Sequence, residues 1–278
     1  MIPANARSIG EAIGVEVQGR TGEDFLLPDV AEECQRLLDS HGVVVYRQAH
    51  ISDPDLVAFS TMLGQVVVSG AGSHPDHPEI SPVSMDPARS PLAGLRRSTI
   101  FWHADGLMDS VPQKATLLTA REVADDGGDT EFANTYAAYE ALPADKKAQL
   151  DRYRVVHSVT ASQLLLEPNP TAQQRAKWDS APSREHPLVW THRDGRKSLL
   201  IGATAERVVG LDDEASKVVL DDILEWATQP QFVLHHRWEV GDLVVWDNTG
   251  MLHRAMPYEP TSRRLMHRTT LVGEEAIA

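Results

Sequence analysis

The sequence predicts an α+β, mainly β fold, in which a double-sheet β roll (a double-stranded β-helix, or jelly-roll, core) is flanked by helices. The chain contains many short apolar runs separated by turn residues, which is typical of strands. Its helix signals gather in the first half of the chain and in segments between strands. Because the chain has 278 residues and no internal repeat, we expect a single domain over residues 1–278.

The individual elements follow from local patterns. Strands are expected at the short apolar or alternating runs, which cover residues 13–17, 43–46, 66–68, 101–105, 115–120, 130–132, 155–159, 188–190, 199–201, 232–238, 243–246 and 265–271. Helices are expected after capping or proline signals, over residues 28–40, 53–63, 134–142, 144–152, 171–178 and 212–226.

Two segments lack apolar periodicity. Residues 69–97 are rich in Gly, Ser, Pro, His and Asp, and a loop of this length inside one domain is often an active-site lid. Its His74 and His77 are expected to be solvated loop residues, although either could touch a substrate. The polar stretch at about residues 167–186 is expected to be an insertion.

Composition excludes several classes of function. The net charge of −14 and the pI near 5.2 disfavour binding to a phosphate backbone, so no nucleic-acid partner is expected. Cys34 is the only cysteine, which excludes an intramolecular disulfide. No signal peptide and no membrane-spanning run is recognised, so we expect a cytoplasmic protein without membrane partners.

The stretch Phe101-Trp102-His103-Ala104-Asp105 offers two metal ligands. In an extended strand, His103 and Asp105 would point to the same side. A second histidine would complete the 2-His-1-carboxylate set of non-haem Fe(II) oxygenases. Taken alone, such a pair is more often a capping or surface pair at a strand end than a metal site.

His253 is the best candidate for the third ligand, because it follows the buried strand that ends at Trp246 and a turn there could aim it at His103 and Asp105. The other histidines near strands are expected to be core or surface imidazoles, and they are His235, His236 and His267.

The last strand carries two arginines on one face. Arg264, Met266 and Arg268 alternate with residues of the opposite face. If their face is internal, the arginines require an anionic ligand such as a carboxylate, because a buried guanidinium cannot lose its charge. If it is external, both are simply solvated. The pattern alone does not decide between these alternatives, and Arg263 is expected to lie outside.

In order along nearly the whole chain, the sequence resembles the taurine and 2,4-dichlorophenoxyacetate dioxygenase family of Fe(II)/2-oxoglutarate enzymes. The motifs that carry the resemblance are Trp102-His103-Ala104-Asp105, Gly127-Gly128-Asp129-Thr130, Trp246-Asp247-Asn248 with His253, and Arg264-Leu265-Met266-His267-Arg268. Each motif alone is weak, but the set together is specific.

The resemblance implies a cofactor, two co-substrates and a residue set. It implies that His103, Asp105 and His253 hold Fe(II), and that 2-oxoglutarate and O2 are consumed with release of succinate and CO2. It implies that Thr130 contacts 2-oxoglutarate, that Arg264 pairs with its distal carboxylate, and that Arg268 reaches an anionic group of the substrate or keto acid. Asp105 favours oxygen transfer, because Gly or Ala there would suggest a halogenase.

For the substrate, the resemblance favours the phenoxyacetate enzymes. The sulfonate and sulfate ester members carry a histidine where this chain has Ser69, and Thr99 stands where the taurine enzyme has an amide. We expect cleavage of an aryloxyalkanoate ether to a phenol and an oxo-acid. The alternatives are an alkylsulfatase or sulfonate dioxygenase, a secondary-metabolite hydroxylase, or a binding protein without redox chemistry.

The substrate cavity is expected to be bulky and apolar and to suit an aromatic ring. Its residues, besides Arg268, are predicted to be Trp102, Thr99, Ser69, Val68, Leu107 and Met108. A homo-oligomer that takes a small organic acid is expected.

Overall fold

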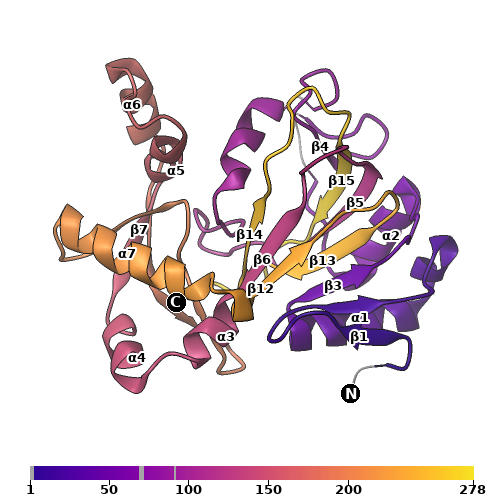
Figure 1. Ribbon diagram of the computed structural model, residues 1–278, viewed down its shortest axis with the longest axis horizontal. Coiled ribbons are helices and arrows are strands. Elements are labelled where there is room, and N and C mark those ends of the chain that lie inside the picture. The colour runs from indigo at the N-terminus through magenta and orange to yellow at the C-terminus, as the bar shows by residue number, and fades with distance from the viewer. Residues whose placement is uncertain (1–2, 69–71, 91) are drawn as a thin grey trace.

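A seven-stranded mixed sheet forms the largest part of this computed structural model, which describes residues 3–68, 72–90 and 92–278. Its strand order is β1 (Ala6–Ser8), β2 (Val15–Val17), β3 (Val43–Tyr46), β13 (Leu243–Asp247), β5 (Ala115–Glu122), β15 (Leu265–Thr270) and β4 (Ser81–Val83). Neighbouring strands are antiparallel except β2 and β3. Figure 1 shows that strands from both ends of the chain meet in this sheet.

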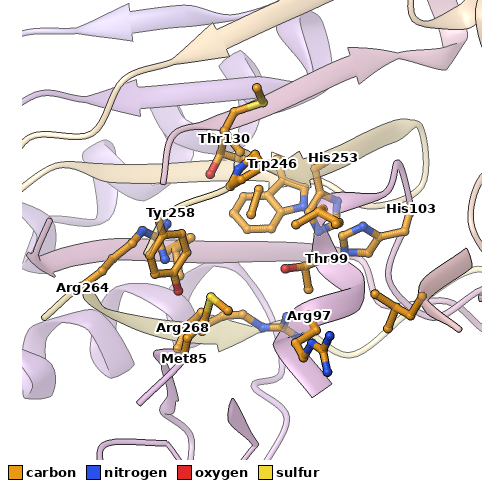
Figure 2. A pocket seen from close by; sticks show the side chains of 17 residues that line it. Met85, Arg97, Thr99, His103, Thr130, Trp246, His253, Tyr258, Arg264 and Arg268 are labelled. Atoms are coloured by element: carbon orange, nitrogen blue, oxygen red, sulfur yellow. The ribbon is translucent and has the colours of Figure 1, made fainter. Parts of the chain in front are cut away.

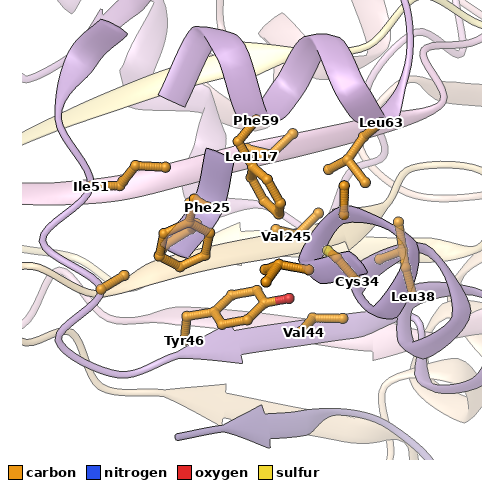
Figure 3. Packing of buried hydrophobic residues seen from close by; sticks show 14 of the residues in the cluster. Phe25, Cys34, Leu38, Val44, Tyr46, Ile51, Phe59, Leu63, Leu117 and Val245 are labelled. Atoms are coloured by element: carbon orange, nitrogen blue, oxygen red, sulfur yellow. The ribbon is translucent and has the colours of Figure 1, made fainter. Parts of the chain in front are cut away.

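Two helices cover the outer face of the large sheet. They are α1 (Pro28–His41) and α2 (Asp53–Leu63), preceded by the short 3-10 helix η1 (Gly22–Leu26). Phe25 packs edge-on against Tyr46 and Phe59, with ring centroids 5.1 and 5.0 Å apart (Figure 3). Leu117 of β5 and Val245 of β13 belong to the same buried cluster. Burial of these apolar side chains is the main force that holds the helices on the sheet.

A second sheet packs against the opposite face. It contains β12 (Val233–His236), β6 (Thr130–Asn134) and β14 (Met251–Ala255), all antiparallel. Because successive strand residues point to opposite faces, Val244 and Trp246 of β13 point away from the helices. They share a buried cluster with Phe132 of β6 and Met251 of β14. The space between the two sheets is therefore a second core, and the candidate site opens at one end of it.

A third group of elements extends to one side of the two sheets (Figure 1). Its strands are β7 (Arg154–His157), β8 (Arg184–Pro187), β11 (Ala205–Val208), β9 (Val189–Thr191) and β10 (Lys197–Leu199). Its helices are α3 (Thr135–Glu140), α4 (Ala144–Leu150), α5 (Val159–Leu166), α6 (Ala172–Asp179) and α7 (Asp213–Ala227), followed by the 3-10 helix η3 (Pro230–Phe232). The strands expected at residues 188–190 and 199–201 are present, shifted by one or two residues, as β9 and β10, which pair antiparallel around a turn at Gly195.

The expected mixed α/β architecture with a sheet-rich core is confirmed, with seven α-helices in the described residues. Several helix limits agree closely with the signals that predicted them. Gly42, at φ +71°, ends α1, and Asn134 caps α3 by accepting from the Ala137 amide. The pair Asp53-Pro54 predicts Asp53 as the capping residue of α2, but Ser52 caps this helix instead, and its hydroxyl accepts from the Asp55 amide.

Two predicted strands are absent, and one predicted turn is wrong. Val66 forms only an isolated bridge with Leu271, because β15 ends at Thr270. Residues 101–105 form no strand, because the chain turns at Gly106, which has φ +84°. His253 lies in β14 rather than in a turn.

The segment expected to be a lid is partly ordered into regular structure. Ser81–Val83 forms β4 at the edge of the large sheet, and Ala93–Ile100 forms the 3-10 helix η2. Ile80, which precedes β4, is completely buried. Its burial anchors this segment, although the sequence of the segment has no apolar periodicity. Within the part of the chain that the structure describes, no helix is long and apolar enough to cross a membrane.

Candidate active site

His103 and His253 are joined through their backbones. The amide of His103 donates to the carbonyl of His253 at 3.1 Å, and the amide of His253 donates back at 2.8 Å. Their imidazole centroids lie 4.2 Å apart. This isolated bridge therefore brings residues from distant parts of the sequence into one site, although residues 101–105 form no strand.

The orientation of the His103 ring is fixed by its own segment. Its Nδ1 lies 2.8 Å from the carbonyl oxygen of Phe101, which can only accept a hydrogen bond. Nδ1 therefore carries the hydrogen, and Nε2 is the nitrogen whose lone pair can bind a metal ion. A backbone carbonyl that holds one ring nitrogen in this way is typical of histidines that bind metals.

Asp105 completes the group. Its Oδ2 lies 3.9 Å from Nε2 of His253, and one ligand atom from each of His103, Asp105 and His253 lies within 4.8 Å of the other two. Two imidazoles and one carboxylate are the donor set that suits an Fe(II) ion with open positions. The residues present thus fit a metal of this kind.

His253 is suited to be a neutral ligand. Burial, together with the neighbouring His103, lowers the pKa of His253 to about 3. The ring is therefore uncharged at neutral pH. A neutral imidazole keeps the lone pair that a metal ion requires.

A cavity of about 230 Å³ opens beside the two histidines. This volume is below the usual range of ligand pockets, roughly 300–1,000 Å³, and suits only small molecules. Figure 2 shows His103, His253 and Trp246 along one side and Arg264 at one end. The cavity is lined by Val83, Met85, Arg97, Thr99, Ile100, His103, Leu118, Thr130, Leu166, Trp246, His253, Ala255, Met256, Pro257, Tyr258, Arg264 and Arg268.

Arg264 is a buried cation at the end of the cavity. The residue is 3% exposed, its Nε donates to the carbonyl of Gly128 at 3.1 Å, and its guanidinium lies over the ring of Tyr258. Among the described residues no carboxylate lies within ion-pair distance of it. Because an arginine cannot escape its charge by losing a proton, this end of the cavity favours an anionic ligand.

Thr130 lines the same cavity as Arg264 and is also buried. Its hydroxyl oxygen accepts a hydrogen bond from Nε1 of Trp238 at 2.9 Å. With that lone pair used, the O–H group of Thr130 can donate into the cavity. Thr130 and Arg264 thus bring a neutral and a charged donor to the same cavity.

Arg268 has a partner within the protein. Its Nη1 lies 3.4 Å from Oδ2 of Asp105, and its Nε donates to the hydroxyl of Thr270 at 3.2 Å. The structure thus places Arg264, just before β15, and Arg268, within β15, in the lining of the cavity, which is the internal alternative of the two that the sequence left open.

Most of the predicted lining residues lie outside this cavity. Of that set only Thr99 lines the cavity. Trp102 packs instead under the guanidinium of Arg254, and Leu107 is buried in a small cluster with Trp190 and Leu200. Met108 lies outside the cavity, Val68 is 64% exposed, and Ser69 lies outside the described residues.

The cavity is lined instead by residues that sequence reasoning missed. Met85 follows β4, Arg97 and Ile100 belong to η2, Leu166 ends α5, and Tyr258 follows β14. The only sequence signal was the closeness of Arg97 and Ile100 to His103. Leu166 carried no signal, because α5 reaches the site from the third group of elements.

The other histidines near strands lie in different surroundings. His236 is buried beside Asp242, with Nε2 and Oδ2 3.3 Å apart, and His235 contacts Asp129 at 2.8 Å. Neither residue lines the cavity. The structure therefore brings only His253, of the four histidines considered for the third position, next to His103 and Asp105 within the described residues.

A second group of possible ligands contains Asp53, His74 and His267. Nδ1 of His267 lies 2.7 Å from Oδ1 of Asp53, and Nη2 of Arg121 lies 2.5 Å from the same oxygen. Oδ1 of Asp53 is thus held by two short contacts within the protein. This group ties the segment before β4 to α2 and β15, so His74 is not the solvated loop residue that was expected.

Comparisons with known proteins agree with this geometry. Residues 5–270 match the family described as "Taurine catabolism dioxygenase TauD, TfdA family". The chain is 35% identical over 260 residues to the alpha-ketoglutarate-dependent 2,4-dichlorophenoxyacetate dioxygenase of Cupriavidus pinatubonensis, with 88% of this chain and 89% of that protein covered. It is 31% identical to the (S)-phenoxypropionate/alpha-ketoglutarate-dioxygenase of Sphingobium herbicidovorans, with 85% of this chain and 84% of that protein covered.

A solved structure shows the same fold. The crystal structure of AAD-2 in complex with Mn(II) and N-oxalylglycine matches with a TM-score of 0.80 and 28% sequence identity, and 98% of each chain is covered. That protein was therefore solved with a divalent metal ion and a small oxalyl compound.

Proposed function

The chain belongs to the TauD, TfdA dioxygenase family, and from this premise we propose that it cleaves a small aryloxyalkanoate such as a phenoxyacetate. It is a 2-oxoglutarate-dependent dioxygenase that uses Fe(II), 2-oxoglutarate and O2. The single observation that carries the substrate proposal is a small cavity, mostly apolar at its sides and cationic at its ends, next to the two histidines and the aspartate.

In this proposal His103, Asp105 and His253 hold the iron. Their support is the donor set, the convergence of three ligand atoms and the neutral state of His253. When bound, iron couples the oxidative decarboxylation of 2-oxoglutarate to insertion of oxygen into a C–H bond of the substrate. The side chains of this protein position the co-substrate and the substrate for that reaction.

Arg264 and Thr130 hold the distal carboxylate of 2-oxoglutarate in this proposal. A guanidinium presents two parallel donors to a planar carboxylate. The packing of Arg264 between Gly128 and Tyr258 fixes its plane in advance. Pre-organisation of this kind lowers the entropy cost of binding.

The proposed reaction converts an aryloxyalkanoate, 2-oxoglutarate and O2 into a phenol, an oxo-acid, succinate and CO2. Hydroxylation of the carbon next to the ether oxygen gives a hemiacetal, whose hydroxyl proton passes to the phenol oxygen as the C–O bond breaks. Ile100, Leu118 and Leu166 exclude water from the side of the cavity where an aromatic ring would lie. Such a lining favours a ring over a small polar body such as taurine.

We also propose that the large sheet and the sheet of β12, β6 and β14 form the two halves of a double-stranded β-helix, within one domain over residues 1–278. The near-complete coverage by the family and by the solved structure supports this. The segment at residues 69–97 remains a proposed lid. Assembly into a homo-oligomer and a cytoplasmic location remain predictions.

A substrate panel tests the function. Purified iron-loaded protein is supplied with 2-oxoglutarate and with phenoxyacetate, phenoxypropionate, an alkyl sulfate or taurine, and phenol, sulfate and sulfite are measured. Phenol from the first two compounds alone supports the proposal. Release of sulfate or sulfite without phenol would replace it by the alkylsulfatase or sulfonate reading.

A further inference from the structure

The cavity carries more positive charge than the co-substrate explains. Its lining residues include three arginines, Arg97, Arg264 and Arg268, and no aspartate or glutamate. Guanidinium groups that face one small space repel each other unless anions lie between them. A second anion, besides the distal carboxylate of 2-oxoglutarate, is therefore expected in this space.

Two of the three arginines already have a partner or a proposed ligand. Arg264 is buried at the end of the cavity next to Thr130, and the proposed function assigns it to 2-oxoglutarate. Arg268 is paired with Asp105 at 3.4 Å and bonded to Thr270. A side chain held by two partners is less able to turn toward an incoming substrate.

Arg97 is different. It lies in the last turn of η2, is exposed to solvent, and forms no hydrogen bond or ion pair within the part of the chain that the structure describes. Figure 2 shows it near Thr99, across the cavity from Arg264. Its guanidinium is thus available to an anion that enters from solvent.

We propose that Arg97 binds the anionic group of the substrate and thereby selects acids over neutral analogues. This inference rests on the proposed function and names the residue that recognises the carboxylate. In an aryloxyacetate the carboxylate is attached to the carbon that is oxidised. Binding at Arg97, six residues before His103 on one segment, keeps that carbon on the side of the cavity where the two histidines lie.

The same placement orients the rest of the substrate. Met85, Ile100 and Leu166 line the cavity together with Arg97 and offer an apolar surface to the ring. A carboxylate held at Arg97 would prevent the molecule from entering with its ring and acid exchanged. Arg97 therefore selects both the charge of the substrate and its orientation in the cavity.

The test compares an acid with its uncharged analogue. Binding of phenoxyacetate and phenoxyacetamide to the metal-loaded protein with N-oxalylglycine is measured by calorimetry, and the Michaelis constants are measured with 2-oxoglutarate. The variants are Arg97→Leu and Arg97→Lys. Arg36→Leu is the matched control, because Arg36 is exposed on α1, outside the cavity, and its replacement changes the net charge equally.

We expect Arg97→Leu to weaken binding of the acid by about five- to tenfold, a moderate effect because the pair is partly solvated. Binding of the amide and the Michaelis constant for 2-oxoglutarate should stay within about twofold. Arg97→Lys should recover part of the loss, and Arg36→Leu should change nothing.

Three results would overturn the proposal: equal loss for acid and amide, a rise confined to 2-oxoglutarate, or no change. If wild-type protein binds no aryloxyacetate, the proposed function fails on its own. The variants are then compared with a panel of small carboxylates, sulfonates and sulfates. An organic anion that binds wild type and Arg97→Leu equally well would show that Arg97 does not recognise the anion.

Discussion

Arg268 and Asp105 form an ion pair inside the candidate site, with Nη1 and Oδ2 3.4 Å apart and side-chain exposures of 21% and 16%. The pair links the strand β15, which contains Arg268, to the segment that supplies two of the proposed iron ligands. Arg268 therefore acts on the carboxylate ligand in addition to any contact with a small molecule.

Arg268→Ala is expected to weaken iron binding by about tenfold, because loss of the guanidinium leaves Asp105 without this partner in a half-buried place. Iron affinity is measured by titration under anaerobic conditions, with Arg268→Lys as the variant that keeps the charge. If iron affinity is unchanged while the Michaelis constant for the acid substrate rises, Arg268 acts on the substrate, as the sequence first suggested.

Replacement of any proposed ligand should abolish metal binding. His103→Ala, Asp105→Ala and His253→Ala are each expected to lose stoichiometric iron and all turnover while the circular dichroism spectrum stays native. His235→Ala is the control, because that histidine is 49% exposed and lies outside the cavity. Near-normal iron content in His253→Ala would require another third ligand, and His236 would be the next to test.

Arg264→Lys should raise the Michaelis constant for 2-oxoglutarate. A lysine presents a single charged point instead of two parallel donors. Loss of a charge-assisted pair in a desolvated pocket costs about 2–5 kcal/mol, so the constant should rise at least about tenfold. Arg263→Lys is the neighbouring control, since Arg263 is 85% exposed and pairs with Glu122 outside the cavity. Equal behaviour of the two variants would mean that the keto acid binds elsewhere.

Gly128 is expected to be required for the position of Arg264. A Cβ atom at residue 128 would lie 2.9 Å from Cδ and 3.0 Å from Nε of Arg264, and its φ is +74°. Gly128→Ala should therefore raise the Michaelis constant for 2-oxoglutarate and lower the free energy of unfolding by about 1 kcal/mol.

Gly195→Ala separates these two effects. Gly195 also has a positive φ, +87°, but a Cβ atom there would meet nothing within 4 Å. We expect a similar loss of stability in chemical denaturation and an unchanged Michaelis constant. If Gly128→Ala behaves in the same way as Gly195→Ala, the contact with Arg264 has no role in binding.

The sequence predicted the polar residues of the site better than its apolar walls. Arg264 and Arg268 both line the cavity, and His103 and Asp105 lie together, as their even spacing in the sequence predicted. The same rule argues against Trp102 as a lining residue. Neighbours in an extended segment point to opposite sides, so Trp102 points away from the cavity when His103 points into it.

The missed residues come from segments without periodicity. Arg97 belongs to a 3-10 helix and Leu166 to the end of α5, and their positions depend on tertiary packing that local patterns do not encode. The β4 strand was missed for the same reason, because three residues are too short to show alternation. Its pairing with β15 becomes evident only when the sheet is assembled.

The ratio of phenol to succinate tests the central claim most directly. Iron-loaded protein is incubated with phenoxyacetate, 2-oxoglutarate and O2, and both products are quantified over the same interval, with and without an iron chelator. The account predicts equal amounts of phenol and succinate, and neither product when the chelator is present. Succinate without phenol, or phenol that forms without iron, would contradict it.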